Sequence, residues 1–197
     1  MKLFRGLAAH DPTNADWRRN LARSLFFHAT LLRRKGAIAP SLSELGEAEG
    51  IAKRLLAKDP TWRPRRDLSN IDVASATALL SSRNVTAARD KAREAIALLE
   101  PTSRSNATTR TALAEAYVAL GDAEAAADNH AAAMKAWQAA YDLLQPVSAS
   151  MDPRQLATIT AALIHLGRQR DAQPLVSHLH EIGFREGDFE HLVQHLR

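Results

Sequence analysis

Two arginine-rich stretches offer the clearest chemistry in this sequence of 197 residues. The block Arg-Arg-Asn/Asp-Leu occurs at 18–21 and again 47 residues later, at 65–68. A guanidinium group donates a planar fork of hydrogen bonds that matches a carboxylate. We therefore predict that side chains in and near these blocks grip a carboxylate or an acidic peptide. The candidate partner-binding residues are Arg19, Asn20, Arg23, Arg65, Arg66 and Asn70.

The same basic residues have two other interpretations. They can be solvated, or they can bond to the turns around Asp11 and Asp59, where exposed ion pairs add little stability. Nucleic acid is a weaker use of this charge, because surfaces that bind single strands interleave basic residues with aromatic ones. Here only Trp17 and Trp62 accompany the arginines, and Trp17 is expected in the core.

Histidines near the end of the chain form the only pattern that resembles a metal site. They are His178, His180, His191 and His195, and the last two are four residues apart, so they share one face of a helix. Zinc accepts such ligands, but the HExxH motif is absent. Histidines at helical spacing are common without a metal. We therefore predict no metal site and no cofactor.

The sequence carries no recognisable catalytic motif. Its eight glycines form neither GxGxxG nor GxxxxGK[ST], no GxSxG is present, and cysteine is absent. The carboxylates are scattered, and no spacing pairs two of them. We therefore assign no catalytic residues and predict that the protein is not an enzyme.

Repetition indicates which elements position these residues. Asp-Pro occurs at 11–12 and again 48 residues later, at 59–60, and each copy reads as a break between two helices. Alanine-rich sequence favours helices, and no stretch alternates as a strand does. Repetition at this period is typical of a helical solenoid. We expect one all-α domain over 1–197, a stack of about four to five antiparallel hairpins.

Capping residues and breakers mark several helix boundaries. Asn14 or Asp16 can cap a long helix that ends before Gly36, because glycine adopts the left-handed backbone conformation at helix C-termini. Asp152 followed by proline is a second start signal, since proline suits the first turn of a helix.

Two further boundaries are predicted in the interior of the chain. Ser41 and Glu44 have the spacing of a capping box, which predicts a helix start there. Gly121-Asp122 reads as a turn, followed by a helix of about 22 residues that either runs unbroken or breaks near Asn129. Trp137 lies in this helix and is expected to anchor the core.

The two ends of the chain differ from the repeats. Residues 1–10 match the second half of a hairpin whose first half is missing, which suggests that the chain was cut from a longer protein or that Met1 starts a degraded version of one. Residues 184–197 are expected to fold back as a C-terminal cap, because Phe189 and Leu192 follow the helix break at Gly183.

Charge is distributed unevenly within a net value of +4. Residues 1–110 carry 20 Lys/Arg and 11 Asp/Glu, whereas residues 111–197 carry 6 and 11. Such an asymmetry can steer an acidic partner to the first half. No apolar run approaches the ~20 residues that span a bilayer, and the start lacks the apolar core of a signal peptide. We expect a cytoplasmic location, or a periplasmic one if a longer parent protein carries an upstream membrane span.

Several stretches resemble tetratricopeptide (TPR) repeats. At 84–88, 120–122 and 166–172 a turn with Gly, Asn or Asp precedes small residues, as in that family, and proline follows the second helix. Residues 11–24 are similar to the long TPR-like repeats found C-terminal in bacterial serine/threonine kinases and in some transcriptional regulators. The prolines that close the repeats here are 48, 41 and 45 residues apart rather than the family's 34.

The resemblance implies a right-handed α–α superhelix that acts without catalysis. It implies a protein–protein interaction module that holds a peptide or a helix in its concave groove, within a larger bacterial signalling protein. Self-association is the alternative, because the exposed ends of a repeat stack can dock on one another. A nucleic-acid-binding helical repeat is a third and weaker alternative.

Overall fold

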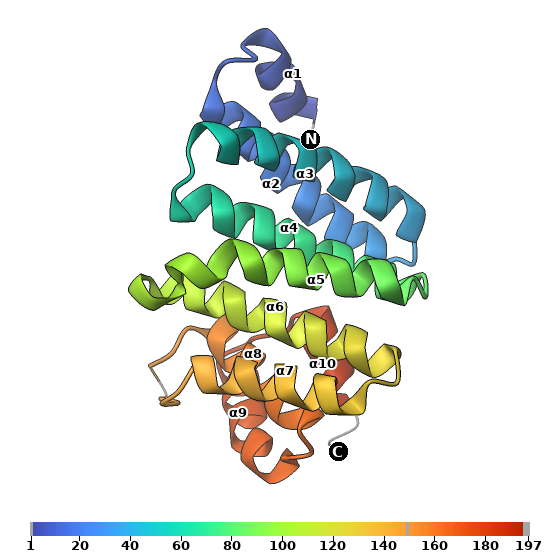
Figure 1. Cartoon of the computed structure of the whole chain (residues 1–197), viewed down its shortest axis with the longest axis vertical. Coiled ribbons are helices and arrows are strands. Elements are labelled where there is room, and N and C mark those ends of the chain that lie inside the picture. The colour runs from blue at the N-terminus through green and yellow to red at the C-terminus, as the bar shows by residue number, and fades with distance from the viewer. Residues whose placement is uncertain (1, 149, 195–197) are drawn as a thin grey trace.

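The computed structural model of the protein describes residues 2–148 and 150–194 (Figure 1). These residues form helices and turns and contain no strand, which confirms the predicted all-α class. The helices are α1 (Lys2–His10), α2 (Ala15–Arg34), α3 (Ile38–Lys58), α4 (Trp62–Ser81), α5 (Val85–Leu99), the 3₁₀ helix η1 (Glu100–Ser105), α6 (Ala107–Ala126), α7 (His130–Leu143), α8 (Pro153–His165), α9 (Gln169–Glu181) and α10 (Gly187–Val193). Among them, none has both the length and the apolar character that crossing a bilayer requires.

Helices that follow one another along the chain pack as hairpins. The pairs are α2 with α3, α4 with α5, α6 with α7 and α8 with α9, and each hairpin also packs on the next (Figure 1). In addition, α2 contacts α4, α4 contacts α6, and α6 contacts α8. These four helices therefore form one layer, which we call the inner layer. The single helix α1 packs on α2.

The local signals fix several helix ends as predicted. The Asn14 side chain caps α2 by accepting hydrogen bonds from two backbone amides, each at 3.1 Å. Asp152 and Gln155 form a capping box at the start of α8. After α2, Gly36 has φ +77°, a conformation that only glycine adopts without strain.

The two Asp-Pro copies fold alike. Oδ1 of Asp11 and of Asp59 each accepts a hydrogen bond from the amide two residues further on, at 2.9 and 3.3 Å respectively. Arg18 and Arg65 then donate to the carbonyl of the proline in their own copy, each at 3.1 Å. A residue of α2 therefore corresponds in place to the residue of α4 that lies 47 positions later.

The C-terminal segment folds back on the last hairpin. Phe189 of α10 is buried against Leu156 of α8 and against Val176 and Leu179 of α9. In the described part of 184–197, α10 therefore packs on α8 and α9. The remaining residues, 195–197, lie outside the part of the chain that the structure describes.

The predicted turn at Gly121-Asp122 is wrong. Helix α6 continues through both residues to Ala126, and the break falls just before Asn129, as the second alternative proposed. Trp137 of α7 is 8% exposed and packs on α6 at this point, so the predicted core anchor is buried. A Cβ on Gly121 would lie 2.3 Å from Nε1 of Trp137. This glycine therefore permits close helix packing rather than a turn.

The predicted capping box at Ser41 is also wrong. Helix α3 begins three residues earlier, at Ile38, and Ser41 is fully buried. Its hydroxyl donates to the carbonyl of Ala29 at 2.8 Å, while the Glu44 carboxylate lies 2.7 Å from Nδ1 of His28. Both polar side chains join α3 to α2, because a partner on the neighbouring helix was available to each.

Replacing Gly121 with alanine should destabilise the fold, although the same change in a helix interior normally stabilises it. We expect Gly121→Ala to lower the free energy of unfolding by ~1–3 kcal/mol, because the rigid indole of Trp137 must move. The matched control is Gly46→Ala in α3, where a Cβ meets nothing within 4 Å. That change should add ~0.5–1 kcal/mol. Urea titrations measure both, and a gain in stability for Gly121→Ala would contradict the packing.

Candidate functional site

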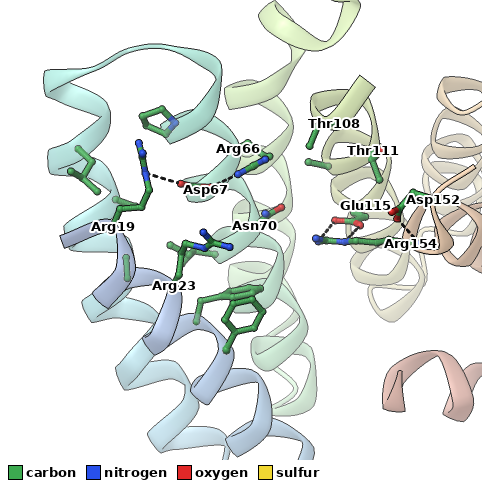
Figure 2. Close-up of a pocket in the computed structure, with 18 of the residues that line it drawn as sticks. Arg19, Arg23, Arg66, Asp67, Asn70, Thr108, Thr111, Glu115, Asp152 and Arg154 are labelled. Carbon is green, nitrogen blue, oxygen red and sulfur yellow. Dashed lines mark hydrogen bonds and ion pairs between the residues drawn. The ribbon is translucent and has the colours of Figure 1, made fainter. Parts of the chain in front are cut away.

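The inner layer encloses a groove of about 440 Å³ (Figure 2). Its walls come from α2, α4, α6 and the start of α8, with Ala52 and Leu55 of α3 added, so helices that are distant in sequence contribute side chains to one surface. Hydroxyl groups of Thr108 and Thr111 and small side chains such as Ala22 and Ala112 line it beside charged groups. A groove of this size and mixed lining suits a peptide segment or a few side chains of a larger partner.

Part of the predicted partner-binding set lies in this groove. Arg19, Arg23, Arg66 and Asn70 line it, and they come from α2 and α4. Asn20 and Arg65 do not belong to the lining. Arg65 is instead held at the turn by the carbonyl of Pro60.

Asp67 engages two of the four lining residues. Its carboxylate lies 3.3 Å from Nε of Arg19 and 2.9 Å from Nη2 of Arg66, so it links α2 to α4 (Figure 2). The Arg66 guanidinium also lies over the ring of Trp62, at 5.3 Å from its centroid. Arg19 and Arg66 therefore hold the groove wall together, and their charge is compensated within the chain.

Arg23 differs from these two arginines. It is exposed, and it makes no hydrogen bond or ion pair with any residue in the described part of the chain. Its side chain extends from α2 toward Asn70 of α4 (Figure 2), and Phe26 and Phe27 line the groove beside it. Arg23 thus offers an uncompensated positive charge next to apolar surface.

An ion pair that was not predicted from the sequence joins α6 and α8 on the opposite wall of the groove. Nε and Nη2 of Arg154 donate to the two carboxylate oxygens of Glu115, at 2.5 and 2.7 Å (Figure 2). Burial raises the pKa of the Glu115 carboxyl above its usual range, although the Arg154 guanidinium acts in the opposite direction. The partners are 39 residues apart in sequence, and no local motif connects them.

A second hollow of about 460 Å³ continues along the same inner face. It shares Phe26, Asn70, Glu115 and Arg154 with the groove, and the C-terminal segment forms its far side through side chains such as Phe184 and Phe189. The two hollows therefore form one continuous inner surface, which the C-terminal segment borders at the second hollow.

An ionic contact ties this cap to the opposite end of the stack. Oδ2 of Asp188 accepts hydrogen bonds from Nη2 of Arg33 at 2.5 Å and from Nη2 of Arg34 at 3.4 Å. Partial burial raises the pKa of Asp188, but the hydrogen bonds and charges of the two guanidinium groups lower it by more. The pKa therefore lies below the usual range. The contact spans 155 residues and links α10 to α2, so the inner layer is bridged at this rim.

A polar contact deeper in the second hollow joins α6, α7 and α8. Oδ1 of Asp122 accepts a hydrogen bond from Nε1 of Trp137 at 3.1 Å and lies 3.3 Å from Nε2 of His165. The indole stacks on the imidazole with ring centroids 4.7 Å apart. Burial raises the pKa of Asp122, with the charge of His165 acting against it. Because each group has a partner and no nucleophile completes the set, we interpret this contact as structural.

The predicted histidine pattern does not form a cluster in the described residues. The Nε2 atom of His180 lies 3.1 Å from Oε1 of Glu190, and its ring contacts Phe189 edge to face. His178 and His191 supply no set of three ligand atoms within 4.8 Å in the part of the chain that is described. His195 lies outside the described residues.

Carboxylates that could hold a cation gather elsewhere, on the side of α3, α4 and α5. Oxygens of Glu49, Asp72 and Glu94 lie within 4.8 Å of one another. The ammonium of Lys91 is bonded to each of the three, at 2.8, 3.4 and 2.8 Å respectively. A positive charge of the chain itself therefore compensates this acidic cluster. Burial raises the pKa of Asp72 to about 7, with Lys91 acting against the shift.

Asp72 should make stability depend on pH. The unfolded chain ionises this carboxyl near pH 4, whereas the folded chain retains its proton up to a pKa of about 7. Between these values the folded state binds more protons, so its stability falls as pH rises. The free energy of unfolding of the native chain, relative to that of Asp72→Asn, should fall by on the order of 2–4 kcal/mol from pH 4 to 8. Asp90→Asn, an exposed change on α5, is the control and should leave the profile unchanged. Denaturant titrations across this range measure it, and parallel profiles for Asp72→Asn and the native chain would show that the carboxyl is not perturbed.

Comparison with known proteins supports the fold and does not extend to a family. No family model matches the chain, and no curated protein matches it. Among solved structures, the chain is similar to the crystal structure of BtubC (BKLC) from P. vanneervenii, with 16% sequence identity and a TM-score of 0.57. The similarity covers 94% of this chain and 74% of that one. At this level of identity the likeness concerns the arrangement of helices alone.

Proposed function

We propose that the protein is a non-catalytic interaction module, a TPR-like right-handed superhelix whose concave face binds an acidic peptide or helix. The packing of successive hairpins and the repeat of 47 to 48 residues support this architecture. In this arrangement the inner layer is the concave face, and the groove that it encloses is the binding site.

The uncompensated guanidinium of Arg23 is the observation that carries this proposal. The acidic side chains of the groove are all engaged: Asp67 by two arginines, Glu115 by Arg154, and Asp152 by the backbone amide at the start of α8. The positive charge of Arg23 is left for an external carboxylate. Apolar surface beside it lowers the local dielectric, which strengthens a charge-assisted hydrogen bond.

The cellular context remains part of the same proposal. We propose that the module serves a larger bacterial signalling protein, as its resemblance to the repeats beside kinases and transcriptional regulators suggests, and that it acts in the cytoplasm. A nucleic acid is a less favoured ligand for the groove than an acidic peptide. Arg19 and Arg66 are already paired with Asp67, so the groove presents little free positive charge to phosphates.

Selection from a phage-displayed library of random peptides tests the proposal. We expect acidic sequences to be enriched, and their affinity to fall at least ~10-fold for Arg23→Glu, because the variant repels the carboxylate that the native side chain attracts. Arg23→Glu breaks no hydrogen bond or ion pair in the described chain, so the fold should persist.

The matched control is Arg54→Glu, an exposed arginine of α3 that lines neither hollow. Selected peptides should bind this variant as they bind the native chain. If the selected peptides bind Arg23→Glu as tightly as they bind the native chain, the groove is not their binding site.

Self-association is the alternative, and the exposed side chain of Leu3 on α1, 69% accessible, favours it. Stacking of one chain on the first helix of another would bury this residue. Light scattering over a concentration series from ~1 to 500 µM measures the molar mass. A mass that rises with concentration, and that stays at 21.6 kDa for Leu3→Ser, supports self-association. A constant monomer mass excludes it.

A further inference from the structure

Helix α2 presents two large apolar side chains to solvent. Phe27 is 58% exposed and Leu31 is 52% exposed, one helical turn apart. Arg23 lies one turn before them and Lys35 one turn after, and both are exposed. Neither cation forms an ion pair with a residue in the described chain. We call these four residues the α2 ridge.

The spacing of the ridge makes it continuous. Arg23, Phe27 and Leu31 recur every four residues, and each step of four turns ~40° about the helix axis, so they form one slowly winding stripe. Lys35, the C-cap residue of α2, follows at the end of the helix. The stripe extends over 12 positions, or ~18 Å at 1.5 Å per residue. It places one cation at each end of an apolar centre. A helix of about a dozen residues has the same length.

The internal repeat allows the ridge residues of α2 to be compared with the corresponding residues of α4. The residues of α4 that correspond to Phe27 and Leu31 are Ala74 and Ala78. Both pack against the core cluster that α2 and α3 contribute, and Ala78 is fully buried. On α4 this side is therefore covered by the preceding hairpin, and its residues are small. On α2 the same side carries large apolar residues, and no described segment covers it.

We propose that the α2 ridge is a docking surface for an acidic amphipathic helix of a partner protein. Phe27 and Leu31 would pack between apolar side chains of that helix, spaced three or four residues apart. Arg23 and Lys35 would meet carboxylates near its two ends. Charge complementarity selects this occupant, because both ends of the ridge carry uncompensated positive charge and the first half of the chain is basic overall. The mode is the helix-on-helix contact that every other inner helix already makes.

The ridge does not depend on the groove being a binding site. Phe27 and Arg23 border the groove, but Leu31 and Lys35 belong to the lining of neither hollow. Changes at Leu31 and Lys35 therefore test the ridge alone. A peptide selected for the groove should bind the Leu31→Ser/Lys35→Glu variant normally, so failure of one proposal leaves the other distinguishable.

The experiment uses a synthetic probe of defined chemistry. It is a fluorescein-labelled, helix-stabilised peptide of about 16 residues, with leucines three and four residues apart at its centre and glutamates near both ends. Fluorescence anisotropy measures its binding to the full chain. We expect saturable binding that weakens at least ~10-fold for Leu31→Ser/Lys35→Glu and is lost when the peptide's glutamates are replaced by lysines.

The matched control changes an exposed apolar residue and an exposed lysine on another face, Met134→Ser/Lys135→Glu on α7. It should bind the probe as the native chain does. Circular dichroism confirms that both double variants are folded. Equal affinity for the two double variants, or no binding up to ~1 mM probe, overturns the proposal. So does sedimentation that shows a dimer of the native chain abolished by Leu31→Ser/Lys35→Glu, because a second copy is then the occupant.

Discussion

Close approach of neighbouring helices is the constraint on which the rest of the structure depends. A hairpin in this chain has an apolar side that it cannot bury alone, so each hairpin is stable only against the next one. The contacts are made largely by alanines, such as Ala29, Ala48, Ala78 and Ala92, which are fully buried. Small side chains let helix backbones approach, and a larger residue at such a place forces them apart. Gly121 under the indole of Trp137 is the extreme case.

The inner face is held together by ion pairs as well as by these apolar contacts. Glu115 with Arg154 joins α6 to α8 at the groove, and Asp188 with Arg33 joins α10 to α2 beside the second hollow. In each pair one partner is largely buried, so salt screens these pairs less than it screens exposed ones. Loss of one partner would leave the other charge poorly solvated.

The sequence predicted features that are decided within a few residues. Asn14, Asp152 and Gly36 act on backbone groups of their own helix end, so their roles can be read locally. Features decided between helices were not predictable in this way. Ser41 has the spacing of a cap, yet it bonds to α2. Gly121 has the appearance of a turn, yet it accommodates α7. In both cases a tertiary contact outweighed a local preference, and only the fold reveals the contact.

The candidate site shows the same division. Spacing placed Arg19, Arg23, Arg66 and Asn70 on two helices, but it could not tell which arginine is free, because Asp67 reaches Arg19 from the neighbouring helix. The repeat resolves the question. Arg23 of α2 and Asn70 of α4 occupy corresponding positions 47 residues apart, and both face the groove. One copy of the repeat carries a charge where the other carries a neutral amide. The unpaired cation is therefore a departure from the repeat, and departures that serve no internal contact are where an external ligand is best sought.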